Sequence, residues 1–444
     1  MKELANKSIT VTAIDIGSSK IIVVLAEVFS DGTYKVLGHG RTESKVTEQG
    51  RESKHSIIAG SIQRPEDLLK KLNEALDEAV RTANFKGPSL GRICTTISGQ
   101  PLTGRNSTAE IPLPGAEVTL EDMKKVVERA EDALELHLDE RLIKSERLYF
   151  CIDDQTEEQG LENPLGVKGS RISVHLHSAV AGAVNAVNRI QLINRTDLDV
   201  STVLPEGWAS GYSVLTEDER QIGVVLVDIG DETTDIVVFK GGHPRFTHTI
   251  NMGGSIITKR LMGYMRCKDF EAEAVKMRLD LRHEKEDETQ ILFSSGVEPN
   301  VRHFNKRELS ILACKEFGAL CNQIGVILYN NGWYIKRDGH PYNKLPGGVV
   351  ITGGATLMMG AAEFISSIPG FYRETFAARQ GRSLYEGDGC MGLTSPRESA
   401  VMGLIAYEAR RFMLGEDDKD VTSEDDTWVS KIKRMTKEFF IGQY

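Results

Sequence analysis

The sequence predicts an α/β protein made of two similar halves, with a small inserted α+β segment and an amphipathic helix near its C-terminal end. Two apolar strands that end in Asp-Ile-Gly predict the halves, because each is followed by a polar turn and two further strands. Helical patterns follow both copies, and a later Gly-Gly turn fits the same plan. With 444 residues, the chain can form two large folding units with insertions.

The internal repeat is the observation on which this prediction depends. Residues 10–40 read TVTAIDIGSSKIIVVLAEVFSDGTYKVLGHG, and residues 223–250 read GVVLVDIGDETTDIVVFKGGHPRFTHTI. Both segments have the order of apolar strand, Asp-Ile-Gly, polar turn, apolar strand, glycine-containing turn and third strand. We therefore expect each half to contain a sheet that begins with this meander.

Helices and an insertion account for most of the remaining chain. Apolar residues recur at helical spacing over 65–84, and further helices are expected at 255–265 and 270–279. Between the halves, strands are expected at 93–98 and 148–152, with a helix that begins after Thr119 in a capping-box pattern. This segment is large enough for a small inserted domain. Residues 280–308 are charged and poorly periodic, which predicts a surface excursion.

Composition restricts the class of protein. Hydrophobic residues make up 40% of the chain and charged residues 27%, as in globular proteins. No apolar run approaches the roughly 18 residues of a membrane-spanning helix, and no signal-peptide pattern begins the sequence, so we expect a cytoplasmic chain. The net charge of −10 disfavours nucleic acid as a partner of the whole surface. Six cysteines without a CxxC pair predict reduced thiols.

The turn after the first strand is a candidate phosphate-binding loop. Gly17 lets the backbone approach an anion closely, because it has no side chain. Ser18 and Ser19 offer hydroxyl and amide donors, and Lys20 offers a cation. One such turn alone is most often a simple hairpin, but a second copy in a matching strand context strengthens the nucleotide interpretation.

The second copy supplies the corresponding candidates Gly230, Thr233 and Thr234. A carboxylate beside phosphate groups is repelled unless a divalent cation lies between them. Asp15 and Asp228 therefore predict a Mg²⁺ ion, held through water. The two copies together predict that both halves contribute to a nucleotide cleft.

A third loop supports the same interpretation. Residues 347–360 read GGVVITGGATLMMG, an apolar strand that runs into a Gly-Gly turn and then a helix. At Gly353 and Gly354 the backbone carries no side chains, so it could lie flat against a base or ribose. The alternative is an ordinary strand-to-helix turn.

The C-terminal end changes composition twice. Residues 415–426 carry seven acidic residues and one Lys, which predicts a solvated linker. Residues 427–444 fit an amphipathic helix with an apolar face and basic flanks, as in helices that lie on membranes. The apolar face consists of Trp428, Ile432, Met435, Phe439 and Phe440. The basic residues are Lys431, Lys433, Arg434 and Lys437. The alternative is an ordinary helix packed on the body of the protein.

Three motifs in this order, AIDIGSSK, VDIGDETTDIVVF and VVITGGA, resemble the actin-type ATPase superfamily. In that superfamily two ribonuclease-H-like halves enclose Mg-ATP. Within it, the chain most resembles the FtsA family of bacterial cell-division proteins. This closer similarity is carried by ISGQPLTGRNS (97–107), NPLGVKGSRISVHLH (163–177), VLTEDERQIGVVLVDIG (214–230) and the basic tail.

The resemblance implies an actin-like fold with four subdomains, one of them inserted. The implied boundaries are 1–85 with 169–200 for the first subdomain, 86–168 for the insertion, 201–252 with 341–414 for the second subdomain, and 253–340 for the smaller subdomain of the second half. The linker at 415–426 and a membrane-targeting helix at 427–444 complete the chain.

The resemblance also implies a function. Members of the family bind ATP with Mg²⁺, assemble into filaments and tether FtsZ to the cytoplasmic face of the membrane at the division septum. By the same resemblance, the FtsZ surface would lie at roughly 253–340, the tail would rest on anionic lipid, and other division proteins would be further partners.

One departure from the family pattern concerns the second loop. Asp231 and Glu232 occupy positions where the family usually has glycine. Two carboxylates near a triphosphate would repel it, and the side chains would restrict the backbone. Either the loop directs these residues outward, or nucleotide binding is weakened. We therefore expect ATP binding with slow turnover at most.

Other functions of the same superfamily stay open from sequence alone. A small-molecule kinase would share the cleft but gives no reason for the basic tail, and the tail also argues against a pilus-assembly relative. A chaperone ATPase would need a further substrate-binding domain. His175 and His177 lie two residues apart, so they could ligate a metal from one face of a strand. No third ligand lies nearby in the sequence, so a metal site there is not expected.

Overall fold

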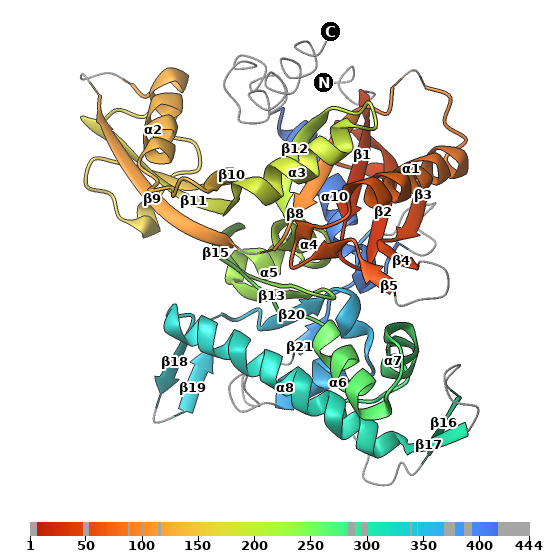
Figure 1. Ribbon diagram of the computed structural model, residues 1–444. Helices are drawn as coiled ribbons and strands as arrows, with labels where there is room; N and C mark the ends of the chain where they lie inside the picture. Colours follow the sequence, from red (N-terminus) through yellow and green to blue (C-terminus); the bar gives the residue numbers. More distant parts are fainter. Residues whose placement is uncertain are drawn as a thin grey trace. The chain divides into compact units, whose positions relative to one another are not determined.

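The structure is a computed structural model that describes residues 7–47, 53–87, 89–99, 101–113, 117–282, 289–294, 301–337, 340–343, 345–367, 378–385 and 393–415. The chain divides into two compact units. Unit 1 contains Met1–Ile97, Val184–Val214 and Gly381–Tyr444, and unit 2 contains Ser98–Ala183 and Leu215–Gln380 (Figure 1). The division into six segments expected from the sequence is finer than this, and it remains a prediction.

Unit 1 is built on a five-stranded sheet in the order β12-β8-β1-β2-β3. The first three strands of the chain form an antiparallel meander, and the other two join it in parallel. These strands are β1 (Ser8–Ile16), β2 (Lys20–Phe29), β3 (Tyr34–Glu43), β8 (Arg92–Ile97) and β12 (Val200–Pro205). Two short hairpins follow β3, formed by β4 (Lys45–Thr47) with β5 (Ser53–His55) and β6 (Ile57–Ile58) with β7 (Ser61–Ile62).

Four helices accompany this sheet: α1 (Pro65–Thr82), α3 (Ala183–Asn194), α4 (Glu206–Val214) and α10 (Ser399–Leu414), the last preceded by a 3-10 turn at Pro396–Glu398. Apolar side chains of α10 pack with those of β1, β2 and α4 in one cluster. Helix α1 lies against β3 so closely that a Cβ atom on Gly40 would sit 2.0 Å from the Ala75 carbonyl oxygen. Glycine is therefore required at this contact.

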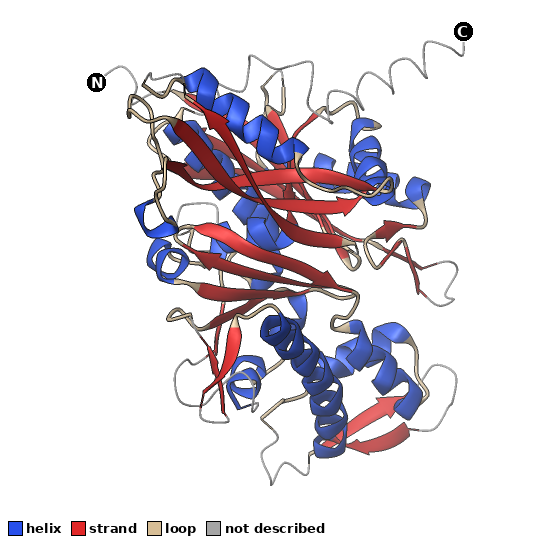
Figure 2. Cartoon of the chain, turned by 90° about the vertical axis from the view of Figure 1, so that its left-hand side faces the viewer, coloured by secondary structure: helices blue, strands red, loops and turns tan. Residues whose placement is uncertain are grey.

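Unit 2 is built on an eight-stranded sheet in the order β10-β11-β9-β15-β14-β13-β20-β21 (Figure 2). The inserted strands are β9 (Leu102–Pro112), β10 (Glu140–Ile152) and β11 (Arg171–Gly182), with α2 (Leu120–Asp132) on one face. The remaining strands are β13 (Val224–Ile229), β14 (Thr234–Lys240), β15 (His243–Ile250), β20 (Val349–Thr352) and β21 (Ala378–Gln380). The insertion thus continues the sheet of the second meander.

The other elements of unit 2 are mainly helical. The helices are α5 (Glu217–Ile222), α6 (Ser255–Met265), α7 (Asp269–Lys276), α8 (Lys306–Asn330) and α9 (Ala361–Ser367), with 3-10 turns at Glu157–Gln159 and Gly354–Leu357. Two hairpins pair β16 (Gln290–Ser294) with β17 (Val301–Asn305) and β18 (Tyr334–Arg337) with β19 (His340–Asn343). The first hairpin lies in the segment expected as a surface excursion.

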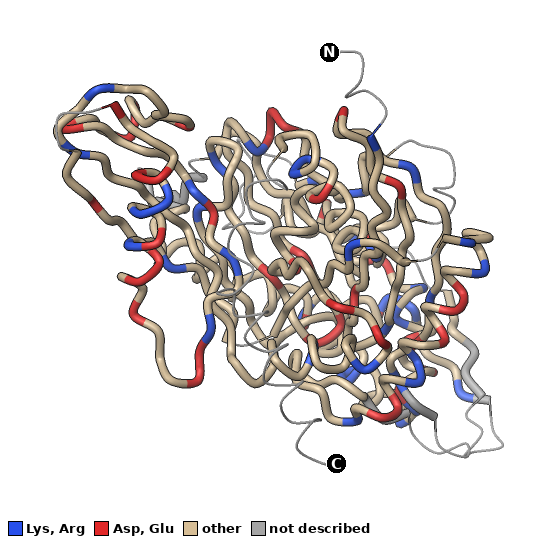
Figure 3. The backbone as a smooth tube through the Cα atoms, turned by 90° about the horizontal axis from the view of Figure 1, so that it is seen from above, with Lys and Arg blue, Asp and Glu red and all other residues tan. Residues whose placement is uncertain are grey.

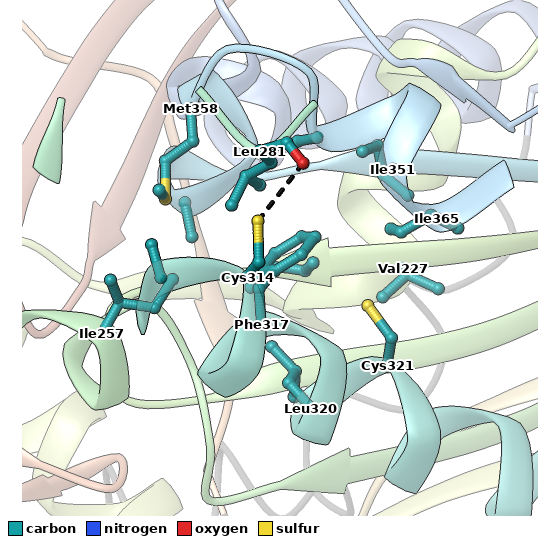
Figure 4. Packing of buried hydrophobic residues seen from close by; sticks show 14 of the residues in the cluster. Val227, Ile257, Leu281, Cys314, Phe317, Leu320, Cys321, Ile351, Met358 and Ile365 are labelled. Carbon is teal, nitrogen blue, oxygen red and sulfur yellow. Dashed lines mark hydrogen bonds between the residues drawn. The ribbon is translucent and has the colours of Figure 1, made fainter. Parts of the chain in front are cut away.

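Helix α8 contributes one side to the core of unit 2. Phe317, Leu320 and Cys321 are buried among side chains of the sheet, α6 and α9 (Figure 4). The Cys314 thiol donates to the Leu281 carbonyl oxygen at 3.2 Å. Among the described helices, α8 alone is long and apolar enough to pass for a membrane span. Its packing is that of a core helix, and such helices meet the same criteria in soluble proteins.

Several local predictions are confirmed. The helix expected at 65–84 is α1, and Pro65 occupies its first turn. The capping box at Thr119 is present, because the Thr119 hydroxyl accepts from the Asp122 amide and the Asp122 carboxylate accepts from the Thr119 amide. The strand expected at 93–98 is present as β8, but its expected place in the insertion is wrong, because β8 pairs with β1 in the sheet of unit 1. Lys and Arg are interspersed with Asp and Glu over the described chain (Figure 3).

Candidate functional site

The first Asp-Ile-Gly turn closes a tight hairpin in unit 1. The Gly17 amide donates to the Lys20 carbonyl oxygen at 2.8 Å, and Asp15 pairs with Ile22 across the two strands. Ser18 and Ser19 form the turn between β1 and β2, and both are partly exposed. The sequence-predicted residues of this loop therefore lie together, at the end where β1 meets β2.

Three buried groups from distant parts of unit 1 hold this hairpin. The Ser44 hydroxyl donates to the Gly17 carbonyl oxygen at 2.7 Å. The Arg189 guanidinium, whose residue is 3% exposed, donates to the Ile16 carbonyl oxygen at 2.5 Å. The Thr96 hydroxyl donates to the Asp15 carboxylate at 3.0 Å. Because a buried carboxylate or carbonyl is stable only when hydrogen-bonded, these groups keep the loop in one conformation.

The second Asp-Ile-Gly turn has the same hydrogen-bond pattern in unit 2. The Gly230 amide donates to the Thr233 carbonyl oxygen at 2.9 Å, and Asp228 pairs with Asp235 across the strands. Among the described residues, none from 228 to 234 has a positive φ. The loop therefore accepts side chains where the family usually has glycine, and the expected backbone restriction carries no strain.

One of the two unusual carboxylates, that of Glu232, is paired with a nearby lysine. Glu232 has a side chain only 10% exposed, so it does not point freely into solvent. Its carboxylate lies 3.4 Å from the ammonium group of Lys259 on α6. Lys259 is mostly exposed, so the pair lies at the edge of the loop, where a cation offsets part of the charge that a phosphate would meet.

The third loop meets the second one within unit 2. Strand β20 runs parallel to β13, and Thr352 pairs with Asp228. Gly353 follows with φ of 90°, and a Cβ atom there would lie 2.3 Å from the Asp228 carboxylate oxygen Oδ1. Only glycine fits this position. Gly354 begins the next 3-10 turn. The structure thus brings the third loop into contact with Asp228 at Gly353.

A further turn that the sequence analysis did not select supports the second loop. At the start of α6, the Gly254 amide donates to the Gly230 carbonyl oxygen at 2.9 Å, and the Ser255 amide donates to the Asp231 carbonyl oxygen at 2.8 Å. Lys276, only 2% exposed, donates to the Gly254 carbonyl oxygen at 3.3 Å. A lone lysine in a helix gives no sequence signal for this role, because its partner lies 22 residues away.

The hydroxyl residues of the second loop differ in what they contact. Thr234 is fully buried, and its hydroxyl donates to the Met252 carbonyl oxygen at 2.7 Å, so it braces the loop. The Thr233 hydroxyl lies 3.4 Å from that of Ser98. Asp235, also missed from the sequence, accepts from the Ser98 hydroxyl at 2.8 Å. Of the two threonines, Thr233 is the one with a partly exposed side chain.

His175 and His177 are occupied by other side chains. Nδ1 of His177 lies 2.7 Å from Oδ1 of Asn106, and Nε2 lies 2.9 Å from the Thr247 hydroxyl. Since Asn Oδ1 only accepts, Nδ1 carries the proton and Nε2 accepts from Thr247. Burial lowers the pKa of His177 to about 4. His175 stacks on Tyr149, and burial also lowers its pKa.

The predicted membrane helix lies outside the described residues. Helix α10 ends at Leu414, and Gly415 follows in a left-handed conformation with φ of 64°. The last described side chains, Met413 and Leu414, are about half exposed. The predicted apolar face from Trp428 to Phe440 and the basic residues around it therefore stay a prediction from sequence.

Comparisons with known proteins concern most of the chain. A family model described as "Cell division protein FtsA" matches residues 225–403, and a model described as "SHS2 domain inserted in FTSA" matches residues 99–180. A protein of Pseudomonas aeruginosa named "Cell division protein FtsA" is 30% identical over 81% of this chain and 80% of its own length. Proteins of the same name from Neisseria meningitidis and Escherichia coli K12 are 28% and 27% identical, covering 89% and 97% of this chain and 89% and 98% of their own lengths.

Solved structures are similar in fold at low sequence identity. A structure entitled "PilM-PilN type IV pilus biogenesis complex" aligns with a TM-score of 0.58 at 15% identity, over 91% of this chain and 98% of that chain. The structure of the MreB5 protein of Spiroplasma citri bound to ADP aligns with a TM-score of 0.53 at 11% identity. The alignment covers 94% of this chain and 99% of that chain. The fold is therefore actin-like, as the sequence predicts.

Proposed function

The chain belongs to the FtsA family of cell-division proteins, and from this premise we propose that it binds ATP, assembles with itself and tethers FtsZ filaments to the cytoplasmic face of the membrane at the septum. The observation that supports this most is the duplicated hairpin. In each unit a glycine amide closes an Asp-Ile-Gly turn onto the carbonyl oxygen three residues later.

For ATP, the proposed contacts are the two hairpin turns and the Gly-Gly turn. Their residues are Asp15, Gly17, Ser18, Ser19, Lys20, Asp228, Gly230, Thr233, Thr234, Gly353 and Gly354. At Gly353 the backbone lies against the Asp228 carboxylate, and a side chain there would overlap with it. Backbone amides and hydroxyls supply neutral donors, and Lys20 supplies the charge.

Asp15 and Asp228 suit Mg²⁺, a hard cation that prefers carboxylate oxygens. The described residues contain no group of three or more potential metal-ligating side chains. A Mg²⁺ ion would therefore complete its shell with water and phosphate oxygens, which agrees with water-mediated binding. When bound, it neutralises charge on the phosphates.

For the membrane, the support is the sequence of the tail. Four basic residues each contribute ~1 kcal/mol near an anionic leaflet, and the apolar face adds partial burial. One tail is thus a modest, reversible anchor. Alignment of many copies in a filament would raise the avidity steeply without new contacts.

For FtsZ, the proposed surface within 253–340 is the face shared by α6, α7, β17 and α8. Tyr264 and Phe270 are 46% and 61% exposed. The Tyr264 ring lies beside that of Phe304, over which the Arg302 guanidinium sits at 5.7 Å. Exposed rings with a cation fit a short peptide that has apolar and acidic residues.

The experiment is electron microscopy and sedimentation on lipid with purified FtsZ. Filaments of FtsZ are expected on anionic liposomes only when this protein is present with ATP. Replacing Trp428 and Phe439 by Glu should release both proteins from lipid, whereas the matched control with Trp428→Phe and Phe439→Leu should retain them. Unchanged sedimentation of the Glu variant would contradict the tail as the anchor.

A second variant separates the FtsZ surface from the membrane anchor. Tyr264→Ser with Phe270→Ser should lower FtsZ recruitment while the protein itself still sediments with liposomes. Leu138→Ser, at an exposed apolar residue of the insertion, is the control. Equal FtsZ recruitment by the wild type, this double variant and the control would contradict the proposed FtsZ surface. Phosphate release stimulated by a sugar or acid substrate would favour a kinase instead.

A further inference from the structure

Asp235 joins the second phosphate loop to the start of the insertion. Its residue is 3% exposed, and its carboxylate accepts from the Ser98 hydroxyl at 2.8 Å and from the Thr249 hydroxyl. Ser98 directly precedes the inserted domain matched at 99–180. The Ser98 hydroxyl also lies 3.4 Å from that of Thr233, a proposed phosphate donor. One buried carboxylate thus connects the loop with the residue that directly precedes the insertion.

The internal repeat makes this carboxylate unusual. In the second hairpin Asp235 pairs with Asp228, and in the first hairpin the residue at the same register position opposite Asp15 is Ile22. Both positions are buried. Burying a carboxylate costs free energy that an isoleucine does not incur, so the hydroxyl donors around Asp235 have a function beyond filling the core.

Thr249, the second partner of Asp235, lies on a strand whose neighbouring side chains contact the same insertion. Thr249 and Thr247 are two residues apart on β15, so their side chains share one face of the sheet. The Thr247 hydroxyl donates to Nε2 of His177 on β11, and Nδ1 of His177 donates to Asn106 on β9. The backbone pairing between β15 and β9 is at His248 and Thr103. One route from Asp235 therefore ends at Ser98, directly before the insertion, and the other ends on inserted strands.

We propose that Asp235 is a positioning residue through which ATP at the second loop stiffens the attachment of the insertion. The proposal depends on the ATP binding proposed above. A phosphate oxygen that accepts from Thr233 fixes the Thr233, Ser98 and Asp235 cluster in one arrangement. Since ordering the cluster also orders the root of the insertion, ATP affinity and attachment are coupled, and the coupling acts equally in both directions.

The test is hydrogen exchange of the full-length protein with and without ATP, after titration calorimetry has measured ATP affinity. In the wild type, ATP should slow exchange of the β9 amides near Thr103 at least threefold. Ser98→Ala and Thr249→Val leave Asp235 in place and remove one donor each. Each should bind ATP three- to tenfold more weakly and lose more than half of the ATP-dependent protection at saturating ATP.

The control variant is Ser145→Ala. It removes a hydroxyl pair with Ser178 inside the insertion, at 3.0 Å, away from Asp235. It should keep both the affinity and the protection. If the wild type binds no ATP, the proposed function fails and the coupling fails with it. If ATP binds but β9 exchange is unchanged, or if Ser98→Ala keeps full protection, the coupling alone is overturned.

Discussion

In the first hairpin the Gly17 amide reaches the Lys20 carbonyl oxygen at 2.8 Å, and in the second the Gly230 amide reaches that of Thr233 at 2.9 Å. The turns are nearly the same, but the groups that support them differ. The first is held by a buried guanidinium and by hydroxyls. The second is held by backbone amides at the start of α6 and by the Gly-Gly turn.

This difference shows that a local motif determines the turn while distant segments determine its surroundings. Unit 1 supplies a cation beside its loop in Lys20. Unit 2 instead has two carboxylates in its loop, one of them paired with Lys259. If both turns bind phosphates, they do so with different electrostatics, and variants in each should fail for different reasons.

The largest effect is expected at Gly353. This residue contacts the second hairpin. Gly353→Ala would place Cβ 2.3 Å from the Asp228 carboxylate at a φ of 90°. The strain and overlap should lower the free energy of unfolding by about 2–4 kcal/mol and abolish ATP binding. Urea denaturation and calorimetry measure both. Gly263→Ala, where Cβ meets nothing within 4 Å, is the control and should be neutral or stabilising.

Arg189 tests the first hairpin. Arg189→Met removes the donor to the buried Ile16 carbonyl oxygen, which should cost about 2–3 kcal/mol of stability and weaken ATP binding. Arg195→Met, directly after the same helix, breaks only an exposed pair with Glu66 and should cost less than about 1 kcal/mol. Equal losses in urea denaturation would mean that the buried contact gives the first hairpin no special support.

Acid should act on unit 2 through His177. Its pKa is about 4 in the fold against 6.5 in the unfolded chain, so the unfolded state binds more protons between these values. Stability is therefore full above pH 6.5 and falls as the pH decreases, by about 2 kcal/mol from pH 7 to pH 5. His177→Gln removes this contribution, so its denaturation should depend less on pH. An unchanged pH dependence would contradict burial as the cause.

The smallest expected effect concerns the charge of the second loop. Glu232→Gln removes one carboxylate without adding backbone freedom, so ATP affinity should rise about threefold, or about 0.7 kcal/mol. Lys259→Gln leaves Glu232 without its cation and should lower the affinity by a similar factor. Calorimetry at low and high salt measures both, and salt should shrink both effects. A lower affinity for Glu232→Gln would indicate that the carboxylate itself assists binding.

The sequence predicted the hairpins because strand, turn and glycine lie within ten residues of one another. It also predicted the Gly-Gly turn after a buried strand. It could not predict that Arg189 reaches Ile16, or that Ser98 reaches Asp235, since these partners are 173 and 137 residues apart and no local pattern joins them. The strand at 93–98 was expected in the insertion but lies in the sheet of unit 1, because a short apolar run does not specify which sheet it joins.

The insertion carries no sheet of its own but lengthens that of unit 2 from β15 through β9 and β11 to β10 (Figure 1). A continuous sheet transmits rotation at its root along its strands, so the opposite end of the insertion, where Ile152 pairs with Ile172, would move farthest. Leu165, in the connection between β10 and β11 at that end, is about half exposed. A fluorescent label at this residue would make small movements near the phosphate loop visible as large changes in distance.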